Sequence, residues 1–133
     1  MIALDTNVLV RLLVHDDEPQ RRSAERLVQD AAQGAGVYLS DVVLAELGWV
    51  LGSSYGYTRT EIGGAIDALV EAREVSFRSL DSVVRALEHY RDGAADLSDY
   101  LIAEAASDAG CCAVASFDVK LQGHPLMSHP DEL

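Results

Sequence analysis

The sequence predicts an α/β domain in which a parallel β-sheet is sandwiched by α-helices. Short apolar runs alternate with longer segments in which apolar residues recur every three or four positions. The runs at 1–4 and 111–115 are apolar without alternation, which is typical of strands buried on both faces of a parallel sheet. A chain of 133 residues is long enough for one core of ordinary size. We therefore expect a single domain spanning residues 1–133.

The first strand is expected to be buried and to end at Asp5. Helical spacing begins directly afterwards at Val8 and Leu9, so Thr6 or Asn7 would start the first helix. In open α/β sheets, ligands bind beyond the carboxyl ends of the strands. Asp5 would therefore stand at the edge of the sheet where chemistry takes place.

Caps and breaks divide the middle of the chain. Pro19 suits the first turn of a helix that ends at Gly34–Gly36, and Ser40 suits an N-cap. Thr58 and Glu61 match a capping box. The expected elements are a helix from Pro19 to Gly34, a strand at 37–39, a helix at 41–51, a loop at 52–57 and a helix from 58 onwards.

The last part of the chain returns to strand-like runs. The expected elements are a strand at 74–77, a helix opened by Asp81, a break at 92–95, a helix at 96–108, a strand at 111–116 and an edge strand at 126–128. Cys111 and Cys112 are adjacent inside an apolar run, so we expect reduced core thiols rather than a disulfide or a metal pair.

Composition and charge exclude several classes of protein. No stretch approaches the roughly 18 uninterrupted apolar residues of a membrane span. The N-terminus lacks a basic region followed by a longer apolar one, so we expect a cytoplasmic protein. The balance of 10 basic against 22 acidic residues gives a net charge of -12, which argues against broad electrostatic attraction to nucleic acid. Such a surface favours basic protein partners and divalent cations.

Two acids follow the buried runs at the two ends of the chain. Asp5 follows the first run, and Asp118 follows the run that ends at Ser116–Phe117. Strands of a parallel sheet end at the same edge, so we expect both carboxylates to emerge there. Taken alone, a helix-capping role for each carboxylate is an equally good interpretation.

Glu46 is an acid in an apolar helical stripe. Its neighbours three and four positions away, which are Val42, Val43, Trp49 and Val50, include no base. A buried carboxylate is costly, so Glu46 must meet a cation, hydrogen-bond donors or water from elsewhere in the fold. The alternative is that this long side chain bends out to solvent.

Asp96 and Asp99 lie three residues apart at the start of a predicted helix and are neighbours on one face. Asp96 is expected to be the N-cap. Asp99 is either a favourable charge at the positive end of the helix dipole or a member of a site beside Asp5.

Several converging carboxylates would repel one another, and some would protonate, unless a divalent metal neutralised them. Oxygen ligands suit Mg²⁺ or Mn²⁺, since the chain has no clustered histidine or cysteine that would recruit zinc. Such ions can generate a hydroxide nucleophile and stabilise the leaving oxygen of a phosphodiester.

Four short motifs in this order resemble the PIN-domain ribonucleases, and most closely the VapC toxins of prokaryotic toxin–antitoxin pairs. The motifs are Asp5-Thr6-Asn7, Leu44-Ala45-Glu46-Leu47, Ser98-Asp99-Tyr100-Leu101-Ile102-Ala103 and Ser116-Phe117-Asp118. The resemblance covers essentially the whole chain. Ser116 stands where many relatives carry threonine, and it keeps the hydroxyl.

The resemblance implies a parallel-sheet domain that cleaves RNA internally with Mg²⁺ or Mn²⁺. By position, Asp5, Glu46, Asp99 and Asp118 would form the catalytic, metal-binding quartet. The same resemblance makes Thr6, Asn7 and Ser116 polar supports, and Asp96 is an additional, less central contributor. It also implies a homodimer and inhibition by a cognate antitoxin protein, for which we expect a basic segment.

Several basic and aromatic side chains near these motifs have both a structural and a functional interpretation. Arg11 and Lys120 could hold phosphates, although solvated surface charge is the simpler interpretation of each. Trp49 lies at helical spacing with the core and is expected to pack there, with a partner groove lined by Trp49, Tyr55 and Tyr57 as the alternative. The scattered histidines receive no catalytic role.

Two rival functions remain open. A phosphoacceptor receiver domain also gathers acids and Mg²⁺ at a parallel-sheet edge, and Asp81 would be its acceptor. That interpretation leaves Glu46 unexplained and must use Lys120, the only lysine of the chain. The third possibility is a PIN-like module that binds partners without catalysis.

Overall fold

The computed structural model describes all residues from Met1 to Leu133, and it confirms an α/β protein with parallel strands flanked by helices. The elements in chain order are β1 (Ile2–Ala3), α1 (Thr6–Leu13), α2 (Glu18–Ala32), β2 (Val37–Leu39), α3 (Asp41–Tyr55), α4 (Arg59–Glu71), β3 (Val75–Phe77), α5 (Leu80–Asp92), α6 (Leu97–Asp108), β4 (Val114–Ala115), the 3₁₀ turn η1 (Val119–Leu121), β5 (Met127–Ser128) and the 3₁₀ turn η2 (Pro130–Glu132). None of the helices is long and apolar enough to cross a bilayer.

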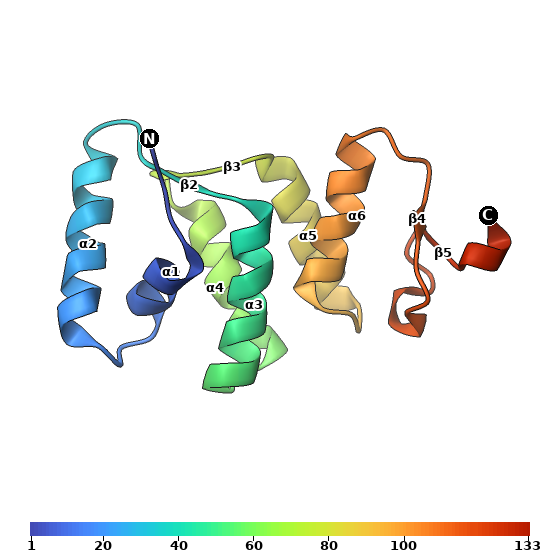
Figure 1. Ribbon diagram of the computed structural model, residues 1–133, viewed down its shortest axis with the longest axis horizontal. Helices are drawn as coiled ribbons and strands as arrows, with labels where there is room; N and C mark the ends of the chain where they lie inside the picture. Colours follow the sequence, from blue (N-terminus) through green and yellow to red (C-terminus); the bar gives the residue numbers. More distant parts are fainter.

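The strands form two separate parallel sheets. The first has the order β1-β2-β3, with Ile2 opposite Val37 and Val37 opposite Val75. The second consists of β4 and β5. Figure 1 shows β1 toward one end of the long axis and the β4–β5 pair toward the other, with α3, α5 and α6 between them. The hydrophobic core lies mainly between β2 and the helices, and α3 supplies three fully buried leucines, Leu44, Leu47 and Leu51.

The expectation that the first strand and the strand at 111–116 are fully buried is wrong. Ile2 and Ala3 of β1 are exposed, and the apolar run at 111–116 forms a strand only at Val114–Ala115. Cys111 and Cys112 are exposed free thiols rather than core residues. The physical reason is that β1 and β4 are both edge strands here, so neither is covered by a neighbour on its second side.

Most helix starts follow their predicted caps. The hydroxyl of Ser40 accepts a hydrogen bond from the Val43 amide at the start of α3, and Thr58 forms the reciprocal capping box with Glu61. The predicted loop at 52–57 is instead the last turn of α3 up to Tyr55. The Ser53 hydroxyl donates back to the Trp49 carbonyl, and Gly56 ends the helix with a φ of 67°.

An arginine on the loop after β3 ties three helices together. The guanidinium of Arg78 lies 2.7 Å from Asp41 at the start of α3 and 2.8 Å from Asp108 at the end of α6. Ser82 of α5 donates a hydrogen bond to the same Asp108 carboxylate. This cluster joins α3, α5 and α6 at one end.

The Asp108 cluster predicts a loss of stability in acid. Hydrogen bonds from Ser82 and then from Arg78 hold the pKa of Asp108 below its ordinary value of 3.8. A carboxyl whose folded pKa is lowered stabilises the fold above its unfolded pKa, and this contribution is lost as pH falls through the folded value. We expect Asp108→Asn to lower the free energy of unfolding at pH 7 and to flatten its decline below about pH 4. Urea unfolding at several pH values measures the free energy of unfolding and its pH dependence. If this free energy changed with pH in the same way in the wild type and in Asp108→Asn, the stabilising role of the Asp108 carboxylate would be contradicted.

Candidate active site

The first half of the candidate site lies at the end of β1. Asp5 is the N-cap of α1, and its carboxylate accepts a 2.8 Å hydrogen bond from the Thr6 amide. The hydroxyl of Thr6, which is buried, donates a 2.7 Å hydrogen bond to the Glu46 carboxylate of α3. This bond joins residues forty positions apart. Thr6 is thus a hydrogen-bond donor from a distant part of the chain that meets Glu46.

Glu46 itself is exposed, so its predicted burial in an apolar stripe is wrong and the solvent-facing alternative holds. It shares a hollow of about 310 Å³ with Asp5, Asn7 and Arg11. Arg11 lies beside the two acids, but its guanidinium binds Asp16 at 2.7 Å and Gln20 at 2.6 Å. The local charge of this hollow is therefore negative.

The second half lies at the start of α6 and the end of β4. Asp96 is the N-cap of α6, as predicted, and its amide donates a 3.1 Å hydrogen bond to the Asp99 carboxylate. Asp118 caps η1 by accepting from the Lys120 amide at 2.9 Å. The hydroxyl of Ser116 accepts a 3.1 Å bond from the Asp118 amide, so it fixes the turn that presents Asp118.

Burial raises the pKa of the Asp99 carboxyl above its ordinary value of 3.8. The negative charges of Asp96 and Asp118 raise it further, whereas the hydrogen bond from the Asp96 backbone and the charge of Lys120 lower it. Asp99 is thus an acid placed among acids in a partly desolvated position. Such a position favours a cation.

The two halves do not meet within this chain. No three acidic, histidine or cysteine side chains approach closely enough to hold a metal ion. The expectation that Asp5 and Asp118 emerge at one sheet edge is wrong for this arrangement, because β4 pairs with β5 rather than with β1. The donor set consists of carboxylate oxygens that suit Mg²⁺ or Mn²⁺. Their arrangement in a single chain does not fit such an ion.

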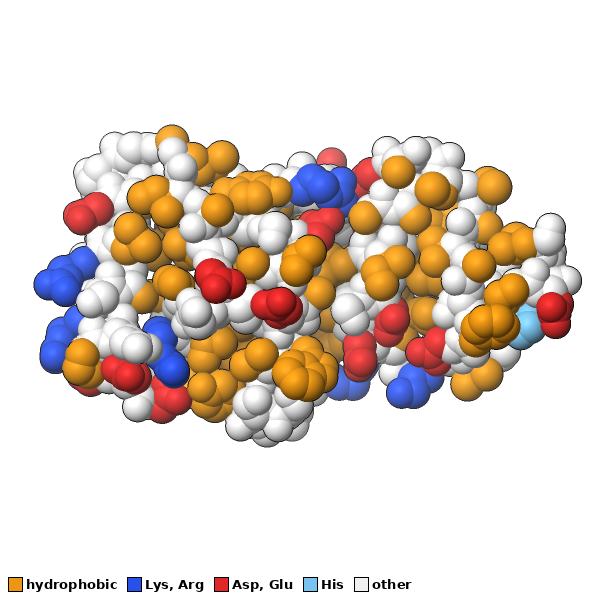
Figure 2. Space-filling view, viewed as in Figure 1, with side chains coloured by type: hydrophobic (Ala, Val, Ile, Leu, Met, Phe, Trp, Pro, Cys, Tyr) orange, Lys and Arg blue, Asp and Glu red, His pale blue; other side chains and the backbone are white.

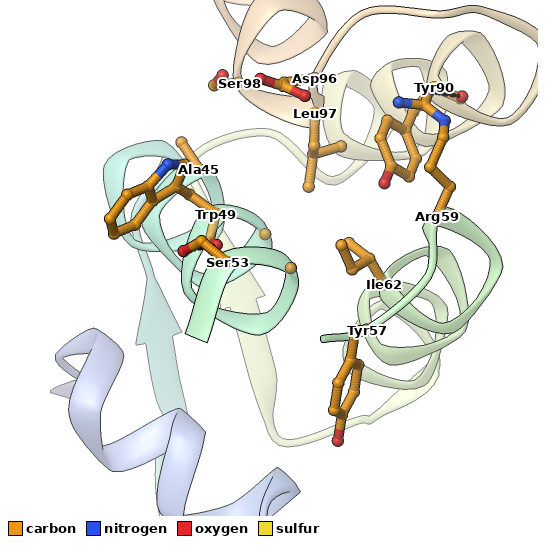
Figure 3. A pocket seen from close by; sticks show the side chains of 12 residues that line it. Ala45, Trp49, Ser53, Tyr57, Arg59, Ile62, Tyr90, Asp96, Leu97 and Ser98 are labelled. Atoms are coloured by element: carbon orange, nitrogen blue, oxygen red, sulfur yellow. Dashed lines mark hydrogen bonds between the residues drawn. The ribbon is translucent and has the colours of Figure 1, made fainter. Parts of the chain in front are cut away.

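A pocket of about 260 Å³ opens between α3, α4 and the start of α6 (Figure 3). Trp49 lines this pocket and is 69% exposed, so its predicted packing in the core is wrong. Of the other two residues of the alternative groove, Tyr57 lines the same pocket, whereas Tyr55 lies in the hollow with Asp5 and Glu46. Asp96 and Ser98, at the start of α6, also line this pocket.

Arg59 is a positioning residue that the sequence did not reveal. Its guanidinium donates to the backbone carbonyls of Ala95, Tyr90 and Gly93, and it stacks 4.0 Å from the centre of the Tyr90 ring. These contacts fasten the loop that leads to Asp96. The only local signal was its place next to the Thr58 cap, and nothing in the sequence pointed to the distant carbonyls.

Loss of this anchor is expected to loosen the second half of the site. Arg59→Ala leaves three carbonyls without their donor and removes the cation–π contact, so we expect a loss of about 1–3 kcal/mol in the free energy of unfolding. Arg59→Lys keeps the charge but not the forked donor geometry. Its free energy of unfolding should therefore lie between those of the wild type and Arg59→Ala. Urea unfolding monitored by circular dichroism measures the difference. Equal midpoints for Arg59→Ala and Arg73→Ala, the latter an exposed arginine outside the pocket, would contradict this role.

Comparison with known families identifies the chain. The model of the PIN domain matches residues 2–124, and the protein belongs to this family. PIN domains are generally nucleases, and they generally use divalent metal ions. A search of curated proteins finds no match.

Proposed function

We propose that the protein is an endoribonuclease that depends on Mg²⁺ or Mn²⁺. Asp5, Glu46, Asp99 and Asp118 are its catalytic and metal-binding acids, and Thr6, Asn7, Asp96 and Ser116 support them. The observation that supports this assignment best is the hydrogen bond of 2.7 Å from Thr6 to Glu46, which joins two of the four motifs across the fold. When bound, the metal would supply an activated water and charge neutralisation at the scissile phosphate.

The residues of this chain prepare the site in ways that do not depend on the ion. Asp5 is held by the amide that it caps, Glu46 by the Thr6 hydroxyl, and Asp99 by the Asp96 amide. Each carboxylate thus keeps at least one oxygen in a fixed position, which lowers the cost of assembling the site.

RNA cleavage tests the proposal. Purified protein should cut a mixed cellular RNA at internal positions with added Mn²⁺ or Mg²⁺, and excess EDTA should abolish cleavage. Mapping the new 5′ ends would identify the preferred sequence. Cleavage that continues unchanged in EDTA would contradict the metal dependence, and metal binding without any cleavage would favour a PIN-like module that only binds partners.

We further propose that the protein is the toxin of a toxin–antitoxin pair that acts in the cytoplasm as a homodimer. The net charge of -12 supports an antitoxin partner with a basic segment. Trp49, exposed beside the pocket between α3, α4 and α6, supports an apolar contact for it. Co-expression with a small basic protein encoded beside this chain should yield a stable complex and suppress cleavage. Separate elution of the two proteins would contradict the pairing.

The receiver interpretation has little support in the fold. Asp81 lies in the first turn of α5 rather than directly at the end of a parallel strand, and the chain matches the PIN family instead.

A further inference from the structure

β1 and β4 both present unpaired backbone groups at a free edge. Ile2 and Leu4 donate from their amides to β2, so the alternation of the strand turns the amide and carbonyl of Ala3 to the outside. Val114 and Ser116 likewise donate to the β5 side, which turns Ala115 outward. Ala3 and Ala115 are both exposed. Small apolar residues on an open edge are a template for pairing with another strand.

The accessible surface of the chain is larger than that of a compact monomer. It measures 7623 Å², whereas a compact protein of 14.3 kDa has about 6,800 Å². The difference, about 800 Å², equals what each partner buries in a standard protein–protein interface.

The middle of the molecule carries exposed apolar side chains on the two helices that separate the free edges. Val42 and Trp49 of α3 are 67% and 69% exposed, and Ile102 of α6 is 54% exposed. Figure 2 shows hydrophobic side chains spread across the middle of this face, with acidic side chains among them. β1 and β4 lie toward opposite ends of the same long axis (Figure 1). A two-fold axis through the middle would therefore bring each free edge to the other edge of a second copy.

We propose that two copies of this chain complete each other, with β4 of each copy pairing in parallel with β1 of the other. This proposal goes beyond simple dimerisation and rests on the proposed nuclease function, because each active site would then be shared between chains. Asp5 and Glu46 would come from one copy, and Asp99 and Asp118 from its partner. The absence of a metal-binding group within one chain follows from this division. Four carboxylates brought together in this way require a divalent cation to offset their repulsion.

Cysteine cross-linking tests the pairing without reference to activity. In a parallel pair, a residue whose amide points to the neighbouring strand lies opposite one whose amide points away, as Ile2 does opposite Val37. Ala3 would therefore face Val114 or Ser116. In a background with Cys111→Ala and Cys112→Ala, one tagged chain carries Ala3→Cys and a differently tagged chain carries Val114→Cys. Mild oxidation of the co-expressed pair should give a disulfide-linked dimer that carries both tags, because facing residues of neighbouring strands lie within disulfide reach. A chain with Ser116→Cys in place of Val114→Cys tests the register two residues away. Ala32→Cys, at the exposed end of α2, is the matched control and should not link to Val114→Cys.

The doubly substituted chain, with Ala3→Cys and Val114→Cys together, distinguishes pairing of β1 with β4 between two chains (exchange) from pairing of the same strands within one chain (closure). Exchange predicts covalent dimers, whereas closure gives a linked monomer that migrates faster than its reduced form and would overturn the proposal. A failure of both Val114→Cys and Ser116→Cys to link with Ala3→Cys would also overturn it.

Complementation tests the shared site. In a heterodimer of Asp5→Asn with Asp118→Asn, one site loses both acids and the other keeps all of them. The purified heterodimer should therefore recover about half of the wild-type cleavage rate, although each variant alone is inactive. Activity that stays at background would overturn the exchange. If the wild type itself cleaves no RNA while the cross-links form, the nuclease assignment fails and the exchanged dimer stands.

Discussion

The Asp99→Asn variant is expected to cleave RNA at least about a hundredfold more slowly than the wild type, with its fold intact. Asparagine can still accept the hydrogen bond from the Asp96 amide, so the start of α6 is preserved. Burial, with the charges of Asp96 and Asp118, raises the pKa of the Asp99 carboxyl. Such a group favours folding most below its ordinary pKa, and that contribution is lost as pH rises through the raised value. At pH 7 the neutral amide should therefore not lower stability.

The control for this variant is Asp81→Asn. Asp81 is exposed in the first turn of α5 and takes no part in the candidate site. Its substitution should leave the cleavage rate near that of the wild type. Initial rates on one RNA substrate at saturating Mn²⁺ provide the comparison. Full activity of Asp99→Asn would remove Asp99 from the site, and loss of activity in Asp81→Asn alone would revive the receiver interpretation.

Gly36→Val is expected to destabilise the protein by about 3 kcal/mol or more. Gly36 has a φ of 76°, a region that β-branched residues rarely adopt. A Cβ atom at this position would overlap the Glu74 carbonyl, which accepts from the Val37 amide at the start of the β2–β3 pairing. The Gly36 carbonyl also accepts from the Ile2 amide, so the same change disturbs β1 and the placement of Asp5.

Gly34→Ala provides the matched control, because it lies two residues away with no close neighbour and without a positive φ. Its effect on the free energy of unfolding should stay within about 0.5 kcal/mol. Thermal unfolding of the wild type, Gly36→Val and Gly34→Ala compares their stabilities. A Gly36→Val protein as stable as Gly34→Ala would contradict the strain assigned to this turn.

Local signals in the sequence predicted much of the fold. Ser40, Thr58 and Asp96 mark helix starts because capping depends on a few neighbouring residues. The short strand at 37–39 was also predicted, since its apolar run ends at a cap. The end of α3 was not, because the glycine and serines at 52–54 look like a loop until Ser53 finds the Trp49 carbonyl within the helix.

The candidate site was harder to predict, since its contacts join distant parts of the chain. The motifs identified the acids, but no local pattern linked Thr6 with Glu46 or Arg59 with the loop before α6. The apolar runs before Asp5 and Asp118 predicted buried strands. An apolar run indicates that a strand can be buried. It does not indicate which strand pairs with it, or whether that strand belongs to the same chain.

Calorimetric titration of Mn²⁺ into the wild type, Asp5→Asn and Asp118→Asn tests the shared metal site. Asp5 follows β1 and Asp118 follows β4, strands of two separate sheets in one chain, but we assign both acids to one metal site. We expect that the wild type binds Mn²⁺ and that each substitution alone weakens the affinity at least about tenfold. Wild-type affinity in either variant would contradict a single site built from the four acids.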